Sequence, residues 1–298
     1  MAFNGTHGIP AASLAGVRLT HPTREVYSEL GVTKLELAEY YVDIAEQILP
    51  CIAGRPLSVV RCPRGQGERC FYQKHFDNQL LPGIDIVRIR ELQGAGTYAT
   101  LKNITGLVQL VQIGALELHQ WSALYTRLEQ PDQIVVDLDP GPGVSWTRLR
   151  SAAREVRERL RQIGLVSFVR TTGGKGLHVV APLEPKYTWE QLRVVAKSIA
   201  EAMHADSPAE FITTADKSQR DGKIFVDYLR NARGATSIAN YSTRARKNAP
   251  VATPLAWDEL GRISSPEHFK LGNIRRRLAR LSDSPWAEFT ELKQRVFA

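Results

Sequence analysis

Two aspartates, Asp137 and Asp139, end a short apolar run in a chain that is otherwise rich in basic residues. The apolar residues 134–136 before them and Pro140 after them are typical of a buried strand and its end. Residues two apart on a strand point to the same face, so both carboxylates are directed at one place. Such charges repel unless a cation lies between them, and oxygen ligands favour Mg²⁺ or Mn²⁺. The pair therefore predicts a divalent metal site.

A third carboxylate, Asp227, ends a similar apolar stretch, residues 224–226, much later in the chain. Carboxylates from two strands can hold two metal ions about 3.5–4 Å apart, which activate an attacking oxygen and stabilise a leaving oxygen in phosphoryl transfer. An Asp-X-Asp motif is short and common, so Asp137 and Asp139 alone do not establish a metal site. The strand-end position of Asp227 strengthens the prediction, because carboxylates at strand ends tend to line clefts.

A glycine-rich segment, residues 171–176, joins two predicted strands and is followed by His178. Backbone N–H groups in such a turn can cradle phosphate oxygens, and Thr172, Lys175 and His178 add a hydroxyl, a positive charge and a further donor. The segment is not a Walker A loop, because the GxxxxGK[ST] spacing is missing and a strand follows it. It indicates a triphosphate site; the alternative is a plain hairpin whose glycines adopt positive φ.

Basic side chains cluster around Asp227, interleaved with polar and aromatic ones. The cluster comprises Lys217, Arg220, Lys223, Arg230, Arg233, Arg244, Arg246 and Lys247, with Tyr228, Asn231, Asn240 and Tyr241 among them. Such a mixture suits contacts to a triphosphate and to a nucleic-acid backbone. The alternative is a solvated basic loop. The closeness of the cluster to Asp227 weakens this alternative.

The N-terminal part carries scattered cations and one aromatic pair. His21, Arg24 and Lys34 indicate little by themselves. Phe71 and Tyr72 are adjacent aromatics among cations, as in a base-stacking platform. Because neighbours on a strand point to opposite faces, we expect one of the two rings to face a ligand and the other to join the core.

Alternating strands and helices must position these residues. The expected strands are 57–62, 71–74, 86–90, 98–101, 118–121, 134–139, 166–170, 177–181 and 223–228; the expected helices are 33–50, 104–116, 146–163, 189–203 and the tail from residue 257. This alternation, without an internal repeat or a low-complexity linker, predicts an α/β fold with an N-terminal elaboration. We expect a flexible leader at residues 1–16 and a single domain at residues 17–298.

Composition narrows the partners and the compartment. The 298 residues are 43% hydrophobic, enough for a packed core, and Lys and Arg exceed Asp and Glu by 39 − 31 = 8. That excess favours DNA or RNA as a partner, although a basic but otherwise ordinary enzyme has the same balance. No apolar run approaches the ~20 residues of a membrane span, and the start is not a signal peptide. Cys51, Cys62 and Cys70 are expected to be free thiols in a reducing cytoplasm.

Three segments in order, DLDP, TTGGKGLHVVAPL and KIFVDYLRN with its basic tail, resemble the motifs of the archaeo-eukaryotic primase superfamily. The chain is most similar to the polymerase domain of bacterial DNA ligase D, from about Val17 to the C-terminus. The resemblance implies a primase-like core with mixed and antiparallel sheets flanked by helices. It implies the polymerase domain alone, and the leader and abrupt C-terminus favour a fragment of a longer ligase.

The resemblance also implies roles for individual residues. Asp137, Asp139 and Asp227 would be catalytic and bind two divalent ions, Mn²⁺ ahead of Mg²⁺. The implied nucleotide contacts are Thr172, Lys175, His178, His119, Arg244 and Lys223. The implied DNA contacts are His21, Arg24 and Lys34 for a 5′-phosphate, and Phe71 for the template. Relatives often carry Ser at Thr172, and Asn and Lys at His21 and Arg24.

The function implied by the resemblance is repair synthesis in bacterial non-homologous end joining. A primer 3′-OH would attack a nucleoside triphosphate, with ribonucleotides preferred, at gaps and broken ends bearing a 5′-phosphate. Ku and the ligase and phosphoesterase domains of the same protein would be partners, near the nucleoid in the cytoplasm. The alternatives are a replicative-type primase, a Mn²⁺-dependent glycosyltransferase with an Asp-X-Asp motif, and a non-catalytic DNA-end-binding module.

Overall fold

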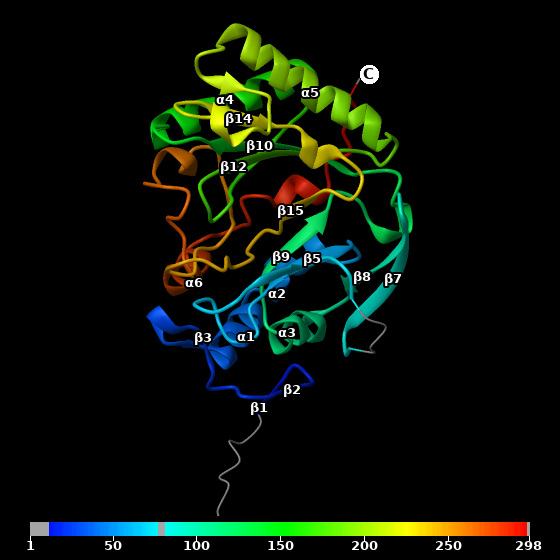
Figure 1. Cartoon of the computed structure of the whole chain (residues 1–298), viewed down its shortest axis with the longest axis vertical. Coiled ribbons are helices and arrows are strands. Elements are labelled where there is room, and N and C mark those ends of the chain that lie inside the picture. Colours follow the sequence, from blue (N-terminus) through cyan, green and yellow to red (C-terminus); the bar gives the residue numbers. More distant parts are fainter. Residues whose placement is uncertain (1–11, 77–80, 297–298) are drawn as a thin grey trace, which may run out of the picture.

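The structure is a computed structural model that describes residues 12–76 and 81–296 (Figure 1). In this part of the chain the strands form two large sheets and two small hairpins. The hairpins pair β1 (Ala12–Leu14) with β2 (Val17–Leu19), and β3 (Glu25–Tyr27) with β4 (Val32–Thr33). The first hairpin includes residues 12–16, which the sequence assigned to the leader; residues 1–11 lie outside the described residues.

The N-terminal sheet has the strand order β15-β9-β5-β8-β7, with β6 also paired to β5. Its strands are β5 (Leu57–Arg61), β6 (Phe71–Gln73), β7 (Ile84–Glu91), β8 (Gly94–Leu101), β9 (Ala115–Trp121) and β15 (Thr236–Ile238). The helices α1 (Lys34–Asp43), α2 (Ala45–Ile52) and α3 (Ile104–Gln112) lie beside it in Figure 1. Its last strand, β15, comes from the C-terminal half, so the two halves of the chain share this sheet.

Two predicted helices of this region differ from the observed ones at their ends. The predicted capping box of Thr33 and Glu36 is confirmed at the start of α1. The single expected helix 33–50 is interrupted at Ile44, and Pro50 lies inside α2 instead of ending it. The helix predicted to reach residue 116 ends at Gln112, because Gly114 adopts a φ of +86° and turns the chain into β9.

The second large sheet carries the predicted acidic strand near its centre, in the order β13-β14-β10-β12-β11-β16. Its strands are β10 (Gln133–Pro140), β11 (Phe168–Thr171), β12 (Leu177–Pro182), β13 (Phe211–Ile212), β14 (Ile224–Asp227) and β16 (Thr253–Leu255). All neighbours in it are antiparallel except β13 and β14. The expectation of mixed and antiparallel sheets flanked by helices is therefore confirmed.

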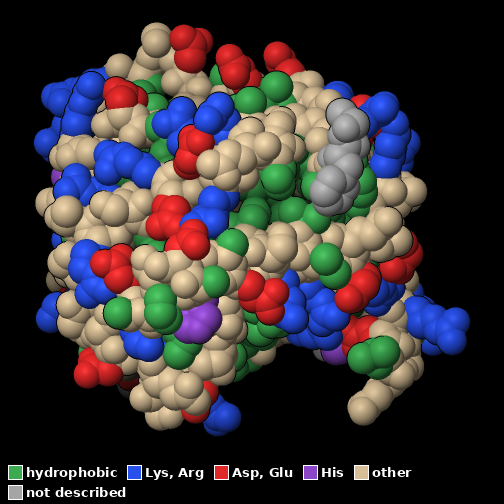
Figure 2. Space-filling view, turned by 90° about the horizontal axis from the view of Figure 1, so that it is seen from above, with side chains coloured by type: hydrophobic (Ala, Val, Ile, Leu, Met, Phe, Trp, Pro, Cys, Tyr) green, Lys and Arg blue, Asp and Glu red, His purple; other side chains and the backbone are tan. Residues whose placement is uncertain are grey.

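Two long helices, α4 (Trp146–Gln162) and α5 (Trp189–Asp206), cover this second sheet at the top of Figure 1. The buried residues of α4 recur at helical spacing: Leu149, Ala152, Ala153, Val156 and Leu160. Figure 2, which views this end from above, shows basic and acidic side chains interspersed. The excess positive charge is therefore not concentrated on this face. Within the described residues, no helix combines the length and the hydrophobicity that a membrane span requires.

The C-terminal tail is mostly irregular, so its prediction as a helical segment is wrong except for α6 (Leu271–Leu278). Two indole groups of the tail bond to β11 and to the residue directly before it. Trp257 donates to the carbonyl of Ser167 at 2.7 Å, and Trp286 donates to that of Val169 at 3.1 Å. These two hydrogen bonds hold the tail against the sheet. A continuous helix could not follow the same path along the sheet.

The cysteine prediction is wrong for one pair, because Cys62 and Cys70 form a disulfide. β5 and β6 are antiparallel, with Arg61 opposite Phe71, and this register brings the next residue of one strand against the preceding residue of the other. Their Cα atoms lie 4.3 Å apart. Cys51 is the free cysteine of the described residues. Free thiols were the reason to expect a reducing compartment, and this reason does not apply to Cys62 and Cys70.

Candidate nucleotidyl-transfer site

The three predicted aspartates meet where β10 and β14 run side by side. Asp137 lies directly opposite Asp227 in the antiparallel register, and Asp139 follows two residues later on the same face. One carboxylate oxygen from each aspartate lies within 4.8 Å of the other two. The structure thus brings together oxygen donors from two strands, as the sequence predicted.

A cation already lies against this cluster. Arg230, from the 3₁₀ turn after β14, places its Nε 2.9 Å from Oδ2 of Asp137 and 3.3 Å from Oδ2 of Asp227. Oδ1 of Asp137 is buried and has no hydrogen-bond partner in the described part of the chain. A carboxylate oxygen without a partner is costly in the interior, and hard divalent cations prefer such donors. These residues therefore fit a divalent metal ion.

The acidities of the three aspartates differ sharply. Burial alone would raise the pKa of Asp137, but His178 and Arg230 outweigh it and hold this pKa well below its usual range. Burial, with the neighbouring charge of Asp137, raises the pKa of Asp139 to about 6. The same two causes raise the pKa of Asp227. Like charges at this distance disfavour each other, so added positive charge would stabilise the fully ionised cluster.

His178 joins the cluster from β12, directly opposite Asp137. Its Nε2 lies 3.3 Å from Oδ2 of Asp137, and its Nδ1 lies 3.1 Å from Nε and 2.9 Å from Nη2 of Arg170. Because a guanidinium only donates, Nδ1 must accept and the neutral ring carries its proton on Nε2. Burial and the charge of Arg170 outweigh Asp137 and lower the pKa of His178 to about 4. The ring is therefore a neutral donor directed at the aspartates near neutral pH.

Arg170 was missed by the sequence reasoning. It lies 1% exposed on β11, where an arginine inside an otherwise apolar strand was the available signal. It also donates to Oδ1 of Asn240 at 3.0 Å and to Oγ of Ser237 at 3.1 Å. Arg170 therefore connects His178 to the segment that follows β14.

The glycine-rich segment is a tight turn between β11 and β12. The hydroxyl of Thr172 accepts from the N–H groups of Gly174 and Gly176 at 3.2 and 3.3 Å, so it organises the turn itself. A Cβ on Gly176 would lie 2.6 Å from the carbonyl of Leu138, so no side chain fits there without displacing β10. Lys175 is exposed beside the aspartates, where its charge is available to an anion.

His119 and Arg244 meet at a glutamate that was also missed. Oε2 of Glu117 lies 2.9 Å from Nε2 of His119 and 3.0 Å from Nε of Arg244. Arg244 also donates to the carbonyl of Thr172 at 2.6 Å, which ties it to the glycine-rich turn. Glu117 and His119 are two apart on β9, so the alternation that revealed the aspartates could have found this pair.

A cavity of about 460 Å³ contains most of these groups. Its basic lining residues are Lys175, Lys217, Arg220, Arg230, Arg244 and Arg246. Lys223, predicted to contact the nucleotide, is not among its lining residues; its carbonyl instead accepts from the N–H of Gly141 at 2.8 Å. A cationic cavity around buried carboxylates can bind a polyphosphate and a metal ion together.

The predicted 5′-phosphate residues also lie together, at the start of α1. The N–H of Lys34 donates to the carbonyl of Arg24, and the N–H of Arg24 donates to that of His21. Nζ of Lys34 donates to the carbonyls of Thr20 and Gln112 at 3.0 Å and to Oε1 of Gln112 at 3.1 Å. Burial lowers the pKa of Lys34 to about 8. We call His21, Arg24 and Lys34 together the Lys34 cluster.

Both members of the aromatic pair are exposed, so the expectation that one ring joins the core is wrong. Phe71 is 42% exposed and Tyr72 is 51% exposed, because β6 is an edge strand that covers neither face of a core. The guanidinium of Arg61 lies over the Phe71 ring at 5.5 Å. Tyr72 packs edge-on to His119 with ring centroids 5.7 Å apart, and His119 lines the 460 Å³ cavity, so this strand contacts the wall of that cavity.

Comparison with known proteins agrees with these features. A family model described as "LigD, primase-polymerase domain" matches residues 33–286. The chain is 37% identical over its full length to the multifunctional non-homologous end joining protein LigD of Pseudomonas aeruginosa, and 36% identical over 90% of its length to that of Mycolicibacterium smegmatis. It covers 36% and 35% of those proteins, about a third of their length.

A solved structure of a ligase D domain has the same fold. The polymerase domain of Mycobacterium tuberculosis ligase D, determined in complex with DNA, superposes with a TM-score of 0.87 at 33% sequence identity. The match covers 93% of this chain and 99% of that one. The two sheets and the helices around them are therefore shared with a known DNA-bound domain.

Proposed function

Because the chain belongs to the LigD primase-polymerase domain family, we propose that it is a nucleotidyltransferase of bacterial non-homologous end joining. It adds nucleotides to the 3′-OH of a primer at gaps and broken ends. The observation that carries this proposal is the cluster of Asp137, Asp139 and Asp227, of which Asp137 and Asp139 line a cationic cavity. Two divalent ions, Mn²⁺ ahead of Mg²⁺, would supply the activation of the 3′-OH and the neutralisation of the leaving pyrophosphate.

The protein groups mainly bind and orient the triphosphate. Lys175, on the turn that Thr172 organises, and Arg244, bonded to the carbonyl of Thr172, attract its phosphates. His178, held by Arg170 with its proton on Nε2, donates toward the same place. His119 contacts the sugar from β9, and a polar partner there would support a preference for ribonucleotides. Lys223 belongs to the basic surroundings of the site and not to its lining.

The Lys34 cluster binds a 5′-phosphate across the gap, and Phe71 stacks on the template. Support comes from the adjacency of His21, Arg24 and Lys34 and from the exposed ring of Phe71. In a full-length ligase, Ku and the ligase and phosphoesterase domains would bring this domain to the break, within the bacterial cytoplasm and at the nucleoid.

The direct test is extension of a gapped primer-template with labelled nucleotides. We expect extension with Mn²⁺, faster incorporation of ribonucleotides than of deoxyribonucleotides, and a dependence on the downstream 5′-phosphate. Failure to extend any primer with either metal would overturn the proposal.

The same assay separates the alternatives. Synthesis that needs no primer would favour a replicative-type primase. Hydrolysis or transfer of a nucleotide sugar without extension would favour a glycosyltransferase. Tight binding of DNA ends without any incorporation would favour a non-catalytic end-binding module.

A further inference from the structure

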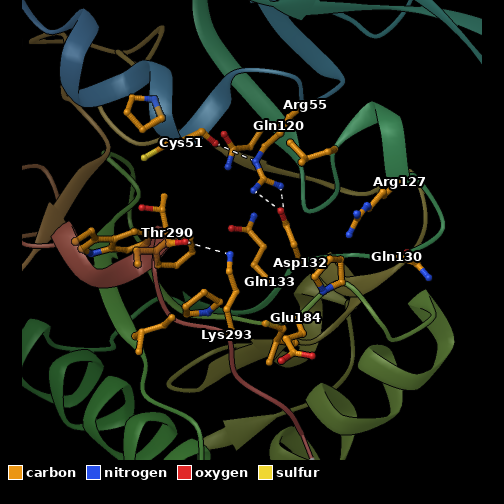
Figure 3. Close-up of a pocket in the computed structure, with 18 of the residues that line it drawn as sticks. Cys51, Arg55, Gln120, Arg127, Gln130, Asp132, Gln133, Glu184, Thr290 and Lys293 are labelled. Atoms are coloured by element: carbon orange, nitrogen blue, oxygen red, sulfur yellow. Dashed lines mark hydrogen bonds and ion pairs between the residues drawn. The ribbon is translucent and has the colours of Figure 1, made fainter.

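A second cavity, of about 590 Å³, has a lining separate from that of the 460 Å³ cavity around the aspartates, which we call the catalytic cavity. Figure 3 shows residues that line this second cavity. Arg170 and Asn240 line it, whereas His178 and Ser237, to which Arg170 donates, line the catalytic cavity. We call it the rear cavity. Its volume falls in the range of small-molecule sites, about 300–1,000 Å³. None of the residues proposed to contact nucleotide or DNA lines it, so it is a separate candidate site.

One wall of the rear cavity is aromatic and belongs to the C-terminal segment. The rings of Trp286 and Phe289 are stacked, with centroids 4.8 Å apart and planes inclined by 21°. Leu292 continues this apolar wall. A flat apolar surface of this kind favours a planar ring in the ligand.

The facing wall is polar, and not all of its hydrogen-bonding groups have partners. Gln120 is 3% exposed, and its buried Oε1 has no hydrogen-bond partner among the described residues. Gln133, also 3% exposed, uses its amide to donate to Oγ of Ser122 at 3.1 Å. Figure 3 shows these two amides on the wall opposite the C-terminal segment. A free amide that can donate and accept matches the edge of a nucleobase, which presents both kinds of group.

The charges of the rear cavity favour an anion. Arg170 is 1% exposed, and its hydrogen-bond partners are a histidine, an asparagine and a serine, with no carboxylate among them. At the rim, Arg127 is exposed, and Nζ of Lys293 makes only a 3.4 Å contact with the carbonyl of Thr290. Arg55 is neutralised by its bidentate pair with Asp132. Asp137 opposes the charge of Arg170 from the catalytic side of His178, but it does not bond to the guanidinium. An anionic ligand in the rear cavity would therefore add to the stabilisation of this buried charge.

We propose that the rear cavity binds a nucleoside monophosphate. The base lies between the Trp286–Phe289 pair and the amide of Gln120, and the phosphate lies among Arg127, Lys293 and the field of Arg170. Neither the base nor the phosphate alone would fill the site. A base without a charge leaves the cations unpaired, and a phosphate alone leaves the aromatic wall exposed.

The test is isothermal titration of the whole chain with AMP in EDTA, so that no divalent ion supports binding in the catalytic cavity. We expect one site with a dissociation constant below about 1 mM, and binding at least about tenfold weaker for inorganic phosphate and for adenosine. Equal binding of AMP and phosphate would mean that surface cations alone are responsible, and no AMP binding would mean that the cavity is not a nucleotide site. Either result overturns the proposal.

Variants locate the bound AMP. Gln120→Met keeps the volume but removes the amide, and we expect about a tenfold loss of AMP affinity. Lys175→Ala in the catalytic cavity should leave the affinity unchanged; the reverse pattern would place the ligand at the catalytic site and overturn the proposal. If Gln120→Met fails to fold, Lys293→Gln is expected to weaken AMP severalfold. Its matched control, Lys197→Gln, alters an exposed lysine paired with Glu201 on α5 and should change nothing.

Discussion

The aspartate cluster and the Lys34 cluster differ in what surrounds their buried charge. The aspartates lie close together, and the guanidinium of Arg230 pairs with Asp137 and Asp227. Lys34 is 5% exposed, and among the described residues its ammonium bonds to carbonyl and amide oxygens and to no carboxylate. The first region has negative charge in excess and selects a cation. The second has a positive charge that no carboxylate neutralises among the described residues, which is why we propose that it binds an anion such as a phosphate.

The largest expected effect comes from breaking the negative region. Asp139→Asn removes one oxygen charge from the cluster, and we expect primer extension to fall by about 10³-fold, because metal stabilisation of the transferring phosphoryl group contributes several kcal/mol. Single-turnover extension with saturating Mn²⁺ measures the loss. The matched control is Asp221→Asn, an exposed aspartate on the β13–β14 connection, which should extend normally. DNA binding by Asp139→Asn should stay near that of the parent, and extension at the parental rate would remove Asp139 from the site.

Removing the guanidinium from the same region should destabilise the metal-free protein. Arg230→Ala leaves Asp137 and Asp227 facing each other, and we expect a loss of about 1–2 kcal/mol in unfolding free energy at pH 7, at the low end because Arg230 is partly exposed. Denaturant unfolding in EDTA measures it, and Mn²⁺ should restore most of it. Arg233→Ala, which breaks an exposed pair with Glu129, is the control. Equal losses in both variants would contradict a special role for Arg230.

Breaking the positive region should affect DNA and not chemistry. For Lys34→Gln we expect about a tenfold weaker affinity for gapped DNA with a 5′-phosphate, because a charged contact to phosphate is lost while the amide can still donate to Thr20 and Gln112. Fluorescence anisotropy with phosphorylated and unphosphorylated duplexes measures it. Lys102→Gln, an exposed lysine paired with Asp85, should keep the full preference. A preference for the 5′-phosphate that survives Lys34→Gln would place the phosphate elsewhere.

The smallest expected effect is a pH dependence of the same preference. Burial lowers the pKa of Lys34 to about 8, so its ammonium is charged below this pH and becomes neutral as the pH rises through it. The phosphate stays ionised throughout this range. We therefore expect the advantage of a 5′-phosphate to fall by about threefold between pH 7 and pH 9, since a bound anion itself holds the proton on Lys34. In Lys34→Arg, whose guanidinium stays charged, the advantage should not change with pH; a parallel decline would assign the effect to another group.

The contrast between these regions also explains what the sequence could reveal. The meeting of Asp137 and Asp139 follows from strand alternation, a local rule, and the fold class follows from the alternation of strands and helices. Arg170 and the Cys62–Cys70 bond depend on partners fixed by sheet register, which single-sequence patterns do not contain. The tail was predicted helical because its local spacing allows it, whereas the indoles of Trp257 and Trp286 attach it to the sheet. The exposure of Tyr72 depends on β6 being an edge strand, which again is a property of the assembled sheet.

The pairing of β10 with β14 also links metal binding to the folding of the chain. Asp137 and Asp227 come from strands far apart in sequence, and they face each other only once the antiparallel register between these strands is complete. An unfolded chain does not hold these two carboxylates together. A divalent ion at this cluster would therefore bind the folded form alone and would raise its unfolding free energy with the logarithm of the ion concentration. The melting temperature should therefore rise with each tenfold increase in Mn²⁺. The size of this rise would report on the formation of the β10–β14 pairing.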